Sequence, residues 1–413
     1  MHRVVLTGLG AISPCGLTVP ETWAAVREAR SGIGLVTGWD TTGWAVRIAG
    51  EVAGFDPNDH FDRKQVRRIE RFVQFAIVAA REAMRDAGLP LDRRLGPRAG
   101  VYLGSGIGGA PAIARNSLIL AERGPRRISP FFIPQSLTNL AGGYIAMEHG
   151  CEGPSLCVST ACATGNHSIG EAWRVIRSGD ADLVIAGGTE ASLFNLGLAG
   201  FMSMRALSKC NDDPARASRP FDASRDGFVM AEGAGVVVME SLERARARGA
   251  RIHAEVLGYA LTNDAHHITS PPEGHSGAVR CMRLALQSAG LEASQIDYIN
   301  AHGTSTQAND RAESQAIRTV FGDHADQLLV SSTKGVTGHL LGAAGGLEAV
   351  LCARALAEQV VPPTAHLREP GDGCDLDYVA GSARPAPIRY ALSNAFGFGG
   401  TNAVIILGRA PDS

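Results

Sequence analysis

Hydrophobic and polar positions change period repeatedly along the chain, from short apolar runs to longer stretches with apolar residues every three or four positions. The short runs predict strands, and the longer pattern predicts amphipathic helices that end at a glycine. The predicted strands are residues 3–9, 99–105, 155–160, 181–188, 233–241 and 296–301. The clearest predicted helices are residues 72–88 and 165–179. This alternation is typical of an α/β protein.

One pattern of strand, small hydroxylic turn and helix occurs twice. "LCVSTACATGNHSIGEA" at residues 156–172 resembles "LLVSSTKGVTGHLLGAA" at residues 328–344. Two related α/β halves, joined near residue 250, would explain the repetition. The alternative is that units of strand, turn and helix resemble one another by chance.

Composition narrows the class of protein. The chain has 413 residues, 39 basic against 41 acidic side chains, and a net charge of −2. A chain of this length holds a large core and about two domains. The balanced charge argues against a general nucleic-acid binder. No apolar run approaches about 18 residues, so we expect no membrane span, and "MHRVVLTGLGAIS" predicts a first strand rather than a signal peptide.

The eight cysteines are scattered and lack metal-finger spacing. They predict reduced thiols in a cytoplasmic protein rather than a disulfide framework. Cys162 differs from the others because small and hydroxylic residues surround it where a strand ends and a helix begins. Helix N–H groups at such a turn would lower the pKa of a thiol, which favours a nucleophile. The alternative is an inert buried cysteine.

Three further segments place chemical groups in glycine-containing turns. His302 follows an apolar strand and precedes Thr304 and Thr306, which alternate as a polar wall would. The segment 331–350 carries Lys334, His339 and Glu348, groups that would set one another's protonation. The segment 393–403 interleaves four glycines with Phe396 and Phe398, a pattern that favours a mobile loop with a bulky plug. Taken singly, each has a structural alternative: a core histidine, a solvated lysine, or a β-turn.

Two patterns suggest a dinucleotide site and a zinc site, but each lacks the neighbouring residues that such a site requires. "GSGIGG" at residues 104–109 matches a dinucleotide-binding fingerprint, but no strand with an acidic end follows about twenty residues later. His266 and His267 are adjacent, and the chain has no H-E-x-x-H motif, so a catalytic zinc site is not expected. A nucleotide-dependent oxidoreductase remains the alternative enzyme class on the residues alone.

Together the segments occur in the order and spacing of one family. The chain resembles the β-ketoacyl-acyl carrier protein synthases, most closely type II of bacterial fatty acid synthesis. The resemblance runs from "VVLTGLGAISPCG" through "SRPFDASRDGFVMAEGAG", "NAHGTSTQANDRAE" and "STKGVTGHLLGAAGG" to "NAFGFGGTN". It implies a thiolase-like, five-layered αβαβα fold, with an N-terminal half at residues 1–250 and a C-terminal half at residues 251–413. It also implies a homodimer.

The resemblance implies decarboxylative condensation of malonyl-acyl carrier protein with an acyl group on Cys162, in fatty acid elongation, without a required cofactor. The implied catalytic residues are Cys162, His302, His339, Lys334 and Phe398. The implied substrate-binding residues are Thr304, Thr306, Ile107, Phe201 and Thr269, with Phe132 and Ile133 reaching the tunnel from a partner subunit. There are two alternatives. One is an accessory chain-length subunit, in which Cys162 would take no part in catalysis, and the other is a condensing enzyme of a specialised pathway.

The resemblance also implies a partner and an ion. The carrier protein of this family is acidic, and the segment "FDRKQVRRIERF" supplies a basic stripe for it. The expected docking residues are Lys64, Arg67, Arg68 and Arg71 on that stripe, with Arg126, Arg127 and Arg205. A structural sodium or potassium ion is expected on Asn300, Glu348, Ser393 and Asn394, whose oxygens suit a hard cation.

Two segments depart from the family pattern. Where the family commonly reads Pro-x-Gly-Asp after "HGTST", this chain reads Gln307-Ala308-Asn309-Asp310. Phe194 and Asn195 stand where type II enzymes tend to have small residues or proline. If that second segment lines the acyl tunnel, the preference for long chains is in doubt.

Overall fold

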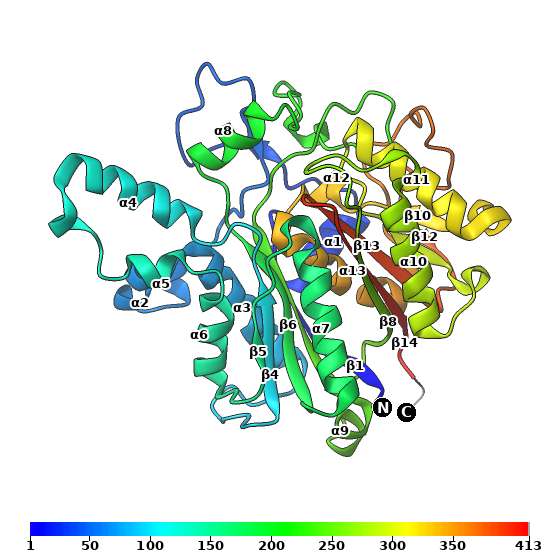
Figure 1. The fold of residues 1–413 in the computed structure, drawn as a ribbon, viewed down its shortest axis with the longest axis horizontal. Coiled ribbons are helices and arrows are strands. Elements are labelled where there is room, and N and C mark those ends of the chain that lie inside the picture. Colours follow the sequence, from blue (N-terminus) through cyan, green and yellow to red (C-terminus); the bar gives the residue numbers. More distant parts are fainter. Residues whose placement is uncertain (412–413) are drawn as a thin grey trace.

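A computed structural model describes residues 1–411 (Figure 1). The last two positions of the expected C-terminal half, 412 and 413, lie outside the described residues. The strands are β1 (Val4–Ile12), β2 (Gly34–Leu35), β3 (Ile48–Ala49), β4 (Ala99–Gly104), β5 (Ser155–Leu156), β6 (Leu183–Glu190), β7 (Gly233–Ser241), β8 (Ala254–Asn263), β9 (Tyr298–Asn300), β10 (Leu329–Ser331), β11 (Val360–Val361), β12 (Arg384–Pro385), β13 (Tyr390–Gly397) and β14 (Thr401–Arg409).

The helices alternate with these strands. They are α1 (Val19–Arg27), α2 (Arg63–Arg68), α3 (Arg71–Asp86), α4 (Ala110–Arg123), α5 (Phe132–Ser136), α6 (Leu140–His149), α7 (Thr164–Ser178), α8 (Asn195–Ser203), α9 (Leu242–Ala247), α10 (Ser276–Ala289), α11 (Gln307–Phe321), α12 (Lys334–Thr337) and α13 (Ala344–Glu358). The predicted strands at 3–9, 99–105, 181–188 and 233–241 are confirmed as β1, β4, β6 and β7, and the two predicted helices as α3 and α7. The strand predicted at 155–160 is wrong beyond Leu156, because the chain there turns toward α7.

Ten strands form one sheet whose two halves repeat the same order. The sequence of neighbours is β10-β9-β13-β14-β8-β1-β7-β6-β4-β5. Counting outward from the β1–β8 contact, each half has two antiparallel pairings followed by two parallel pairings. β1 and β8 pair over only three positions, so the halves diverge and leave space for helices between them.

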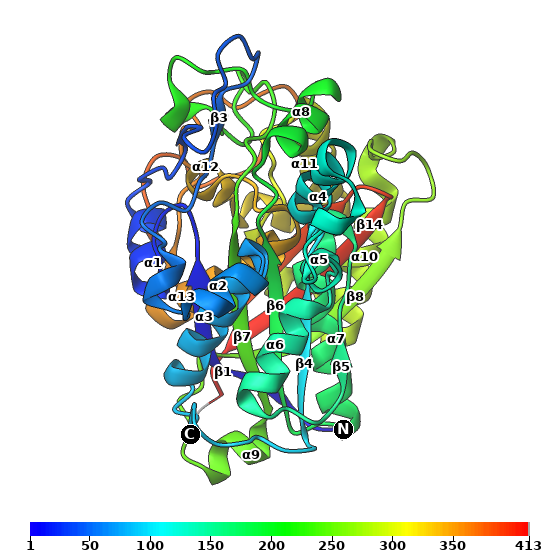
Figure 2. The same cartoon turned by 90° about the vertical axis from the view of Figure 1, so that its left-hand side faces the viewer.

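Helices fill that space and cover both outer faces, giving five layers. α7 and α13 lie between the sheet halves, where each contacts strands from both. α3 and α6 cover the N-terminal strands, the face seen in Figure 2, and α10 covers β8 and β14 on the far side. The two central helices approach closely, since a Cβ added at Gly165 would lie 2.3 Å from the backbone nitrogen of Gly346. Small residues at this crossing therefore set the thickness of the middle layer.

Each central helix begins at a turn of the same shape. Ala161 and Leu341 both have left-handed backbones, with φ of +49° and +50°. Each opens a three-residue 3₁₀ turn that runs into a helix of 15 residues. The repetition expected from the sequence therefore has a different register: Ala161 corresponds to Leu341, whereas the sequence comparison placed it opposite Thr333. We call residues 160–178 the N-terminal elbow and residues 340–358 the C-terminal elbow.

A lobe formed by α2, α4 and α5 projects from the N-terminal half (Figure 1). The side chain of Gln135 in α5 donates to the carbonyl of Arg67 at 3.0 Å, and the guanidinium of Arg68 stacks on Phe131 at 5.0 Å. These contacts join α5 to α2. Several large apolar side chains of the lobe face solvent: Ile113, Leu118, Leu120, Ile133 and Leu137.

Candidate active site

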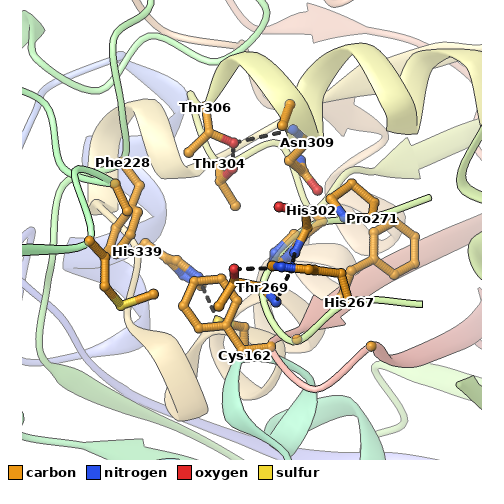
Figure 3. Close-up of a pocket in the computed structure, with 18 of the residues that line it drawn as sticks. Cys162, Phe228, His267, Thr269, Pro271, His302, Thr304, Thr306, Asn309 and His339 are labelled. Atoms are coloured by element: carbon orange, nitrogen blue, oxygen red, sulfur yellow. Dashed lines mark hydrogen bonds between the residues drawn. The ribbon is translucent and has the colours of Figure 1, made fainter. Parts of the chain in front are cut away.

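A cavity of about 320 Å³ opens beside the N-terminal elbow and gathers residues from both halves of the chain. Cys162, His302 and His339 line it, and the thiol sulfur and one nitrogen of each ring lie within 4.8 Å of one another. Figure 3 shows the three side chains around one space, with Thr304 and Thr306 lying beyond the histidines. Residues far apart in sequence thus form a single buried group of one thiol and two imidazoles.

Cys162 is the second residue of the 3₁₀ turn of the N-terminal elbow and is 9% exposed. Burial raises the pKa of its thiol to about 12, although the charge of Lys334 and the backbone N–H of Phe398 act in the opposite direction. The expectation of a lowered pKa is therefore wrong for the free enzyme, because loss of hydration outweighs the favourable groups at the turn. The resting thiol keeps its proton.

His339 is the immediate neighbour of this thiol. Its Nε2 lies 3.1 Å from the sulfur of Cys162, and its ring packs edge-on against Phe228. Backbone hydrogen bonds to Val229 and from Ala231 hold the residue in place. Burial, followed by the charge of Lys334, lowers the pKa of His339 well below its usual value. The imidazole is therefore neutral at physiological pH, with its Nε2 facing the thiol.

His302 follows β9, and its ring centre lies 5.4 Å from that of His339. Burial lowers its pKa well below the usual value, and the charge of Lys334 adds to the effect. Lys334 is itself 1% exposed, donates to the backbone carbonyl of His302 at 2.6 Å, and pairs with Glu348. Burial, with the added charge of Lys334, thus keeps both imidazoles uncharged, and Lys334 also holds the His302 backbone.

Two buried carboxylates that the sequence analysis did not single out fix the loop after His302. Glu313 accepts the backbone N–H groups of His302 and Gly303, both at 2.8 Å. Asp310 accepts those of Thr304 and Ser305 at 2.9 and 3.1 Å. The signal was present in "NDRAE" (309–313), where two acids three residues apart share one helix face.

The predicted substrate-binding residues divide into two groups. Phe201, Thr269, Thr304 and Thr306 line the cavity, and the two hydroxyls of Thr304 and Thr306 lie 2.9 Å apart. Ile107 does not line it, but packs into the apolar cluster that contains Cys162. Phe132 and Ile133 belong to the projecting lobe and are not among the lining residues.

Phe398 lies at the tip of the β13–β14 hairpin and also lines the cavity. Its ring lies 6.5 Å from that of Phe201. Gly399 and Gly400 follow with φ of +85° and +72°, values that favour glycine and allow a tight turn. We call residues 398–400 the gate turn.

The two departures from the family pattern lie in different places. Asn309 lines the cavity of Cys162, where its side chain donates to Asp310 at 3.2 Å. Phe194 and Asn195 instead line a separate open cavity of about 680 Å³, together with Trp39 and Arg71. Phe194 and Asn195 therefore do not touch the space around the thiol.

The N–H groups of the glycine-rich segment 104–109 bind a carboxyl group of the protein itself. The carboxylate of Glu190 accepts the N–H of Gly106 at 2.9 Å and those of Ile107 and Gly108 at 3.3 Å. The N–H of Gly342 from the C-terminal elbow also donates to it, at 3.2 Å. The N–H groups that would bind a dinucleotide phosphate are therefore occupied, which explains why the fingerprint is misleading here.

The four residues expected to hold a cation offer buried oxygens. Asn300, Glu348, Ser393 and Asn394 are each at most 3% exposed. One side-chain oxygen of each has no hydrogen-bond partner: Oδ1 of both asparagines, Oε2 of Glu348 and Oγ of Ser393. The amide nitrogens of the asparagines donate elsewhere, to Tyr298 and Glu313. Unsatisfied buried oxygens of this kind fit a hard cation, which would supply the missing partner.

The expected docking residues are mostly exposed. Within residues 1–411, no ion pair involves Lys64, Arg67, Arg68, Arg126, Arg127 or Arg205. Arg205 lines the mouth of the active-site cavity, and the other five lie on the projecting lobe. Arg71 was misplaced by the sequence analysis: it starts α3 and pairs with buried Glu232 at 2.7 Å, because the stripe is broken between α2 and α3.

Comparison with known proteins agrees with this geometry. The family model for the β-ketoacyl synthase N-terminal domain matches residues 1–245, and that for the C-terminal domain matches residues 253–368. The proteins named 3-oxoacyl-[acyl-carrier-protein] synthase 2 from Coxiella burnetii and Synechocystis are 48% and 49% identical to the chain. The alignments cover 100% and 98% of this chain and 99% and 97% of those proteins.

Solved structures show the same fold. The ishigamide ketosynthase/chain length factor superposes with a TM-score of 0.93 at 40% identity, over 99% of this chain and all of that one. A β-ketoacyl synthase from Burkholderia phymatum gives 0.92 at 35% identity, over the full length of both chains. A type II polyketide ketosynthase in complex with its acyl carrier protein gives 0.92 at 35% identity, over 99% and 100% of the chains. The chain therefore belongs to the β-ketoacyl synthase family and has its thiolase-like fold.

Proposed function

We propose that this enzyme elongates acyl chains by decarboxylative condensation, and that Cys162 carries the growing chain. The observation that carries the proposal is the convergence of Cys162, His302 and His339 in one cavity of a β-ketoacyl synthase. The curated relatives at 48–49% identity are named as synthase 2 enzymes of acyl carrier protein substrates, which supports elongation as the reaction.

Acyl loading is the first step. The thiol proton of Cys162 passes to Nε2 of His339, 3.1 Å away, as the sulfur attacks the acyl thioester of the carrier. The backbone N–H groups of Cys162 and Phe398 stabilise the oxyanion that forms. The carrier thiolate then leaves and takes up the proton, and the acyl group remains on Cys162.

Decarboxylation of the malonyl thioester is the second step. The C–C bond to the carboxylate breaks, CO₂ leaves, and the electron pair moves onto the thioester oxygen as an enolate. His302 and His339 stabilise this oxygen as neutral N–H donors, a charge state that burial and Lys334 maintain. After loading, the ring proton of His339 moves from Nδ1 to Nε2, so that Nε2 can donate to the enolate. The enolate carbon attacks the acyl carbonyl on Cys162, and collapse of the tetrahedral intermediate expels the Cys162 thiolate. This thiolate takes up a proton from water, which restores the resting thiol.

The walls of the cavity suit the two parts of the substrate. Thr304 and Thr306 form a polar wall at hydrogen-bonding distance from each other and are placed to bind the amides of a phosphopantetheine arm, with Thr269 at the mouth. Phe201 and the cluster containing Ile107 are apolar, so we assign the acyl chain to that side of Cys162. Glycines in the gate turn allow Phe398 to move when the chain enters.

We propose an acidic acyl carrier protein as the partner, docked on the exposed docking residues. Arg205 at the cavity mouth would meet the carrier where the arm enters, and the basic side chains of the lobe would extend the contact. In the solved ketosynthase complex, the partner is an acyl carrier protein. Replacing Arg67 and Arg68 by Glu should raise the KM for the carrier at low salt while leaving condensation of small-molecule thioesters unchanged.

A homodimer accounts for the apolar surface of the N-terminal half. β5 is an edge strand with an exposed Leu156, and the neighbouring lobe exposes Leu118 and Ile133. An unpaired edge beside apolar side chains is a surface that proteins cover. Such pairing would bring Phe132 and Ile133 of one subunit toward the tunnel of the other. Light scattering of the wild type and Leu118→Glu measures this: a dimer is expected, weakened by the substitution.

We also propose that the two halves meet between α9 and β8, and that a sodium or potassium ion occupies the oxygens of Asn300, Glu348, Ser393 and Asn394. The repeated strand order supports the division, and the four unpartnered oxygens support the ion. The ion would hold β9, α13 and β13 together, and it takes no part in the chemistry.

No helix of residues 1–411 is long and apolar enough to cross a membrane. We infer a cytoplasmic setting, where the eight unpaired cysteines and the essential thiol stay reduced.

The deciding experiment supplies acyl-carrier primers of increasing length with malonyl-carrier protein and identifies the products by mass spectrometry. β-Ketoacyl products two carbons longer, formed over a range of saturated primers, are expected. Products only from unusual or polyketide-like primers would instead assign a specialised pathway. Stoichiometric acylation of Cys162 without condensation would overturn the proposal, and absence of acylation would point to an accessory chain-length subunit. NADPH-dependent turnover would identify an oxidoreductase.

A further inference from the structure

His275 is a buried residue of the active-site cavity that the condensation steps above do not use. It lines the cavity, is 2% exposed, and its Nδ1 has no hydrogen-bond partner. It also has a left-handed backbone, with φ of +46° and ψ of +55°, immediately before α10. Side chains with a Cβ adopt this conformation at a cost, so the fold maintains strain at a residue that faces the cavity.

The imidazole of His275 contacts two other residues of the cavity. Its Nε2 lies 3.6 Å from Oδ2 of Asp264, within ion-pair distance. Its ring packs edge-on against Phe396 with 4.7 Å between ring centres, and Phe396 in turn packs against His302 at 5.6 Å. Phe396 lies in β13, two residues before Phe398. The side chain of His275 therefore supports both the end of β13 and the carboxylate of Asp264.

Asp264 connects this histidine to the gate turn. Its Oδ1 accepts the side chain of Asn402 at 2.7 Å, and its backbone N–H donates to the carbonyl of Gly400 at 2.8 Å. Burial alone would raise the pKa of Asp264, but its contacts with His275 and Asn402 outweigh burial and lower it. The carboxylate therefore stays charged, and His275 is the ionisable group that faces it within the cavity.

The same segment holds the gate turn at a second point. Asn263 donates from its side chain to the carbonyl of Gly399 at 2.9 Å, and the N–H of Gly399 donates to the carbonyl of Ile268 at 2.7 Å. Four hydrogen bonds thus join residues 263–268 to residues 399–402. We call these contacts the clasp. While it is closed, the N–H of Phe398 lies beside the sulfur of Cys162.

We propose that His275 is a positioning residue for the gate turn, bracing Asp264 and Phe396 so that the clasp stays closed during carbon–carbon bond formation. The inference rests on the proposed condensing function and deepens it. With the clasp closed, the enolate meets the acyl group on Cys162 before water can protonate it. A loosened clasp would release CO₂ from malonyl thioester without forming a β-ketoacyl product. His275 would therefore determine how tightly decarboxylation is coupled to condensation.

The test compares CO₂ released with β-ketoacyl product formed, measured on the full-length enzyme with acyl- and malonyl-carrier protein. In His275→Gly the imidazole is lost and the left-handed backbone is relieved, so folding is favoured. We expect CO₂ per product to rise about threefold or more, a range typical of coupled contacts. The conservative His275→Asn, which tolerates the left-handed backbone and keeps a donor toward Asp264, should restore most of the coupling.

Two controls separate positioning from a general loss of structure. His366→Gly relieves another left-handed histidine, at φ of +67°, which does not line the cavity, and should leave the ratio unchanged. In an Asp264→Ala background, His275→Gly should add little, because its main contact is already lost. A wild-type ratio in His275→Gly, or an equal effect of that change with and without Asp264, would overturn the inference. Absence of condensation by the wild type would instead refute the proposed function itself.

Discussion

The two elbows have the same backbone but contribute different groups to the site. Both have a left-handed residue at their second position, which opens a 3₁₀ turn that continues into a helix of 15 residues. The second position of the turn is Cys162 in the N-terminal elbow and Gly342 in the C-terminal elbow. A Cβ at Gly342 would lie 2.3 Å from the backbone nitrogen of Gly106, so no side chain fits there.

The difference shows how two halves of similar topology contribute different groups to one site. The N-terminal elbow carries the thiol. The C-terminal elbow is preceded by His339, whose Nε2 reaches that thiol, and its own turn instead donates an N–H to the buried Glu190. Glu190 also holds the 104–109 turn, so one elbow carries the thiol while the other follows the neighbouring imidazole and forms the wall behind the site.

The largest effect is expected from removing the group that distinguishes the N-terminal elbow. Cys162→Ala should abolish acyl loading and lower condensation by on the order of 10⁶-fold, since no other group can hold the acyl chain. Mass spectrometry of the enzyme after incubation with acyl-carrier protein measures loading, and circular dichroism checks the fold. Acylation of the variant at the wild-type level would show that the nucleophile lies elsewhere.

The next effect tests the contribution of the C-terminal elbow. Because the resting thiol is protonated, His339→Ala should slow acyl loading by about 10²–10⁴-fold, the usual contribution of a general base. His302→Ala removes an enolate donor without touching the thiol, and should reduce malonyl decarboxylation far more than loading. Single-turnover loading and CO₂ release are measured for both variants. Equal losses in both assays for both variants would contradict this division.

A substitution in the tightly packed turn of the C-terminal elbow should have a smaller effect, on stability rather than on activity. Gly342→Ala should lower the free energy of unfolding by about 1–3 kcal/mol, because the new methyl group overlaps the backbone of Gly106. Gly200→Ala in α8 is the matched control: a Cβ there meets nothing within 4 Å, so that change should be neutral or slightly stabilising. Urea unfolding measures both. Similar stabilities of the two variants would mean that the turn adjusts freely.

Alkylation reports the protonation state of the thiol. Since the pKa of Cys162 is raised to about 12, its thiolate fraction should grow about tenfold for each pH unit between pH 7 and pH 9. The rate of iodoacetamide labelling at Cys162, followed by peptide mass spectrometry, should rise in the same proportion. A rate that levels off near pH 7 would indicate a preformed thiolate, as the sequence alone had suggested.

The smallest effect is expected at the proposed cation site. Sodium or potassium should raise the melting temperature by a few degrees over a buffer containing only a bulky organic cation, because the ion would bind the native state alone. Asn394→Ala removes one of the unpartnered oxygens and should abolish the difference. Identical melting temperatures of the wild type in all three buffers would argue against the ion.

Much of the fold was predictable because its signals are local. The all-buried run of β7 and the glycine that ends α7 define these elements from a few neighbouring residues. The pairing of the two elbows was not predicted in its correct register, because the similarity lies in backbone angles at Ala161 and Leu341 rather than in residue types. The ends of short strands such as β5 depend on tertiary contacts and were also missed.

The sequence by itself determined which chemical groups are present: a thiol in a turn of small and hydroxylic residues, two histidines, and a lysine with a glutamate. The tertiary structure decided their state. Only the assembled fold buries Cys162 deeply enough to keep its proton, and only the fold places His339 beside it from a segment more than a hundred residues away. It also occupies the 104–109 turn with Glu190 and sends Arg71 inward to Glu232. Residue type fixes the available chemistry, whereas hydration and distance, which set pKa values and partners, exist only once the chain has packed.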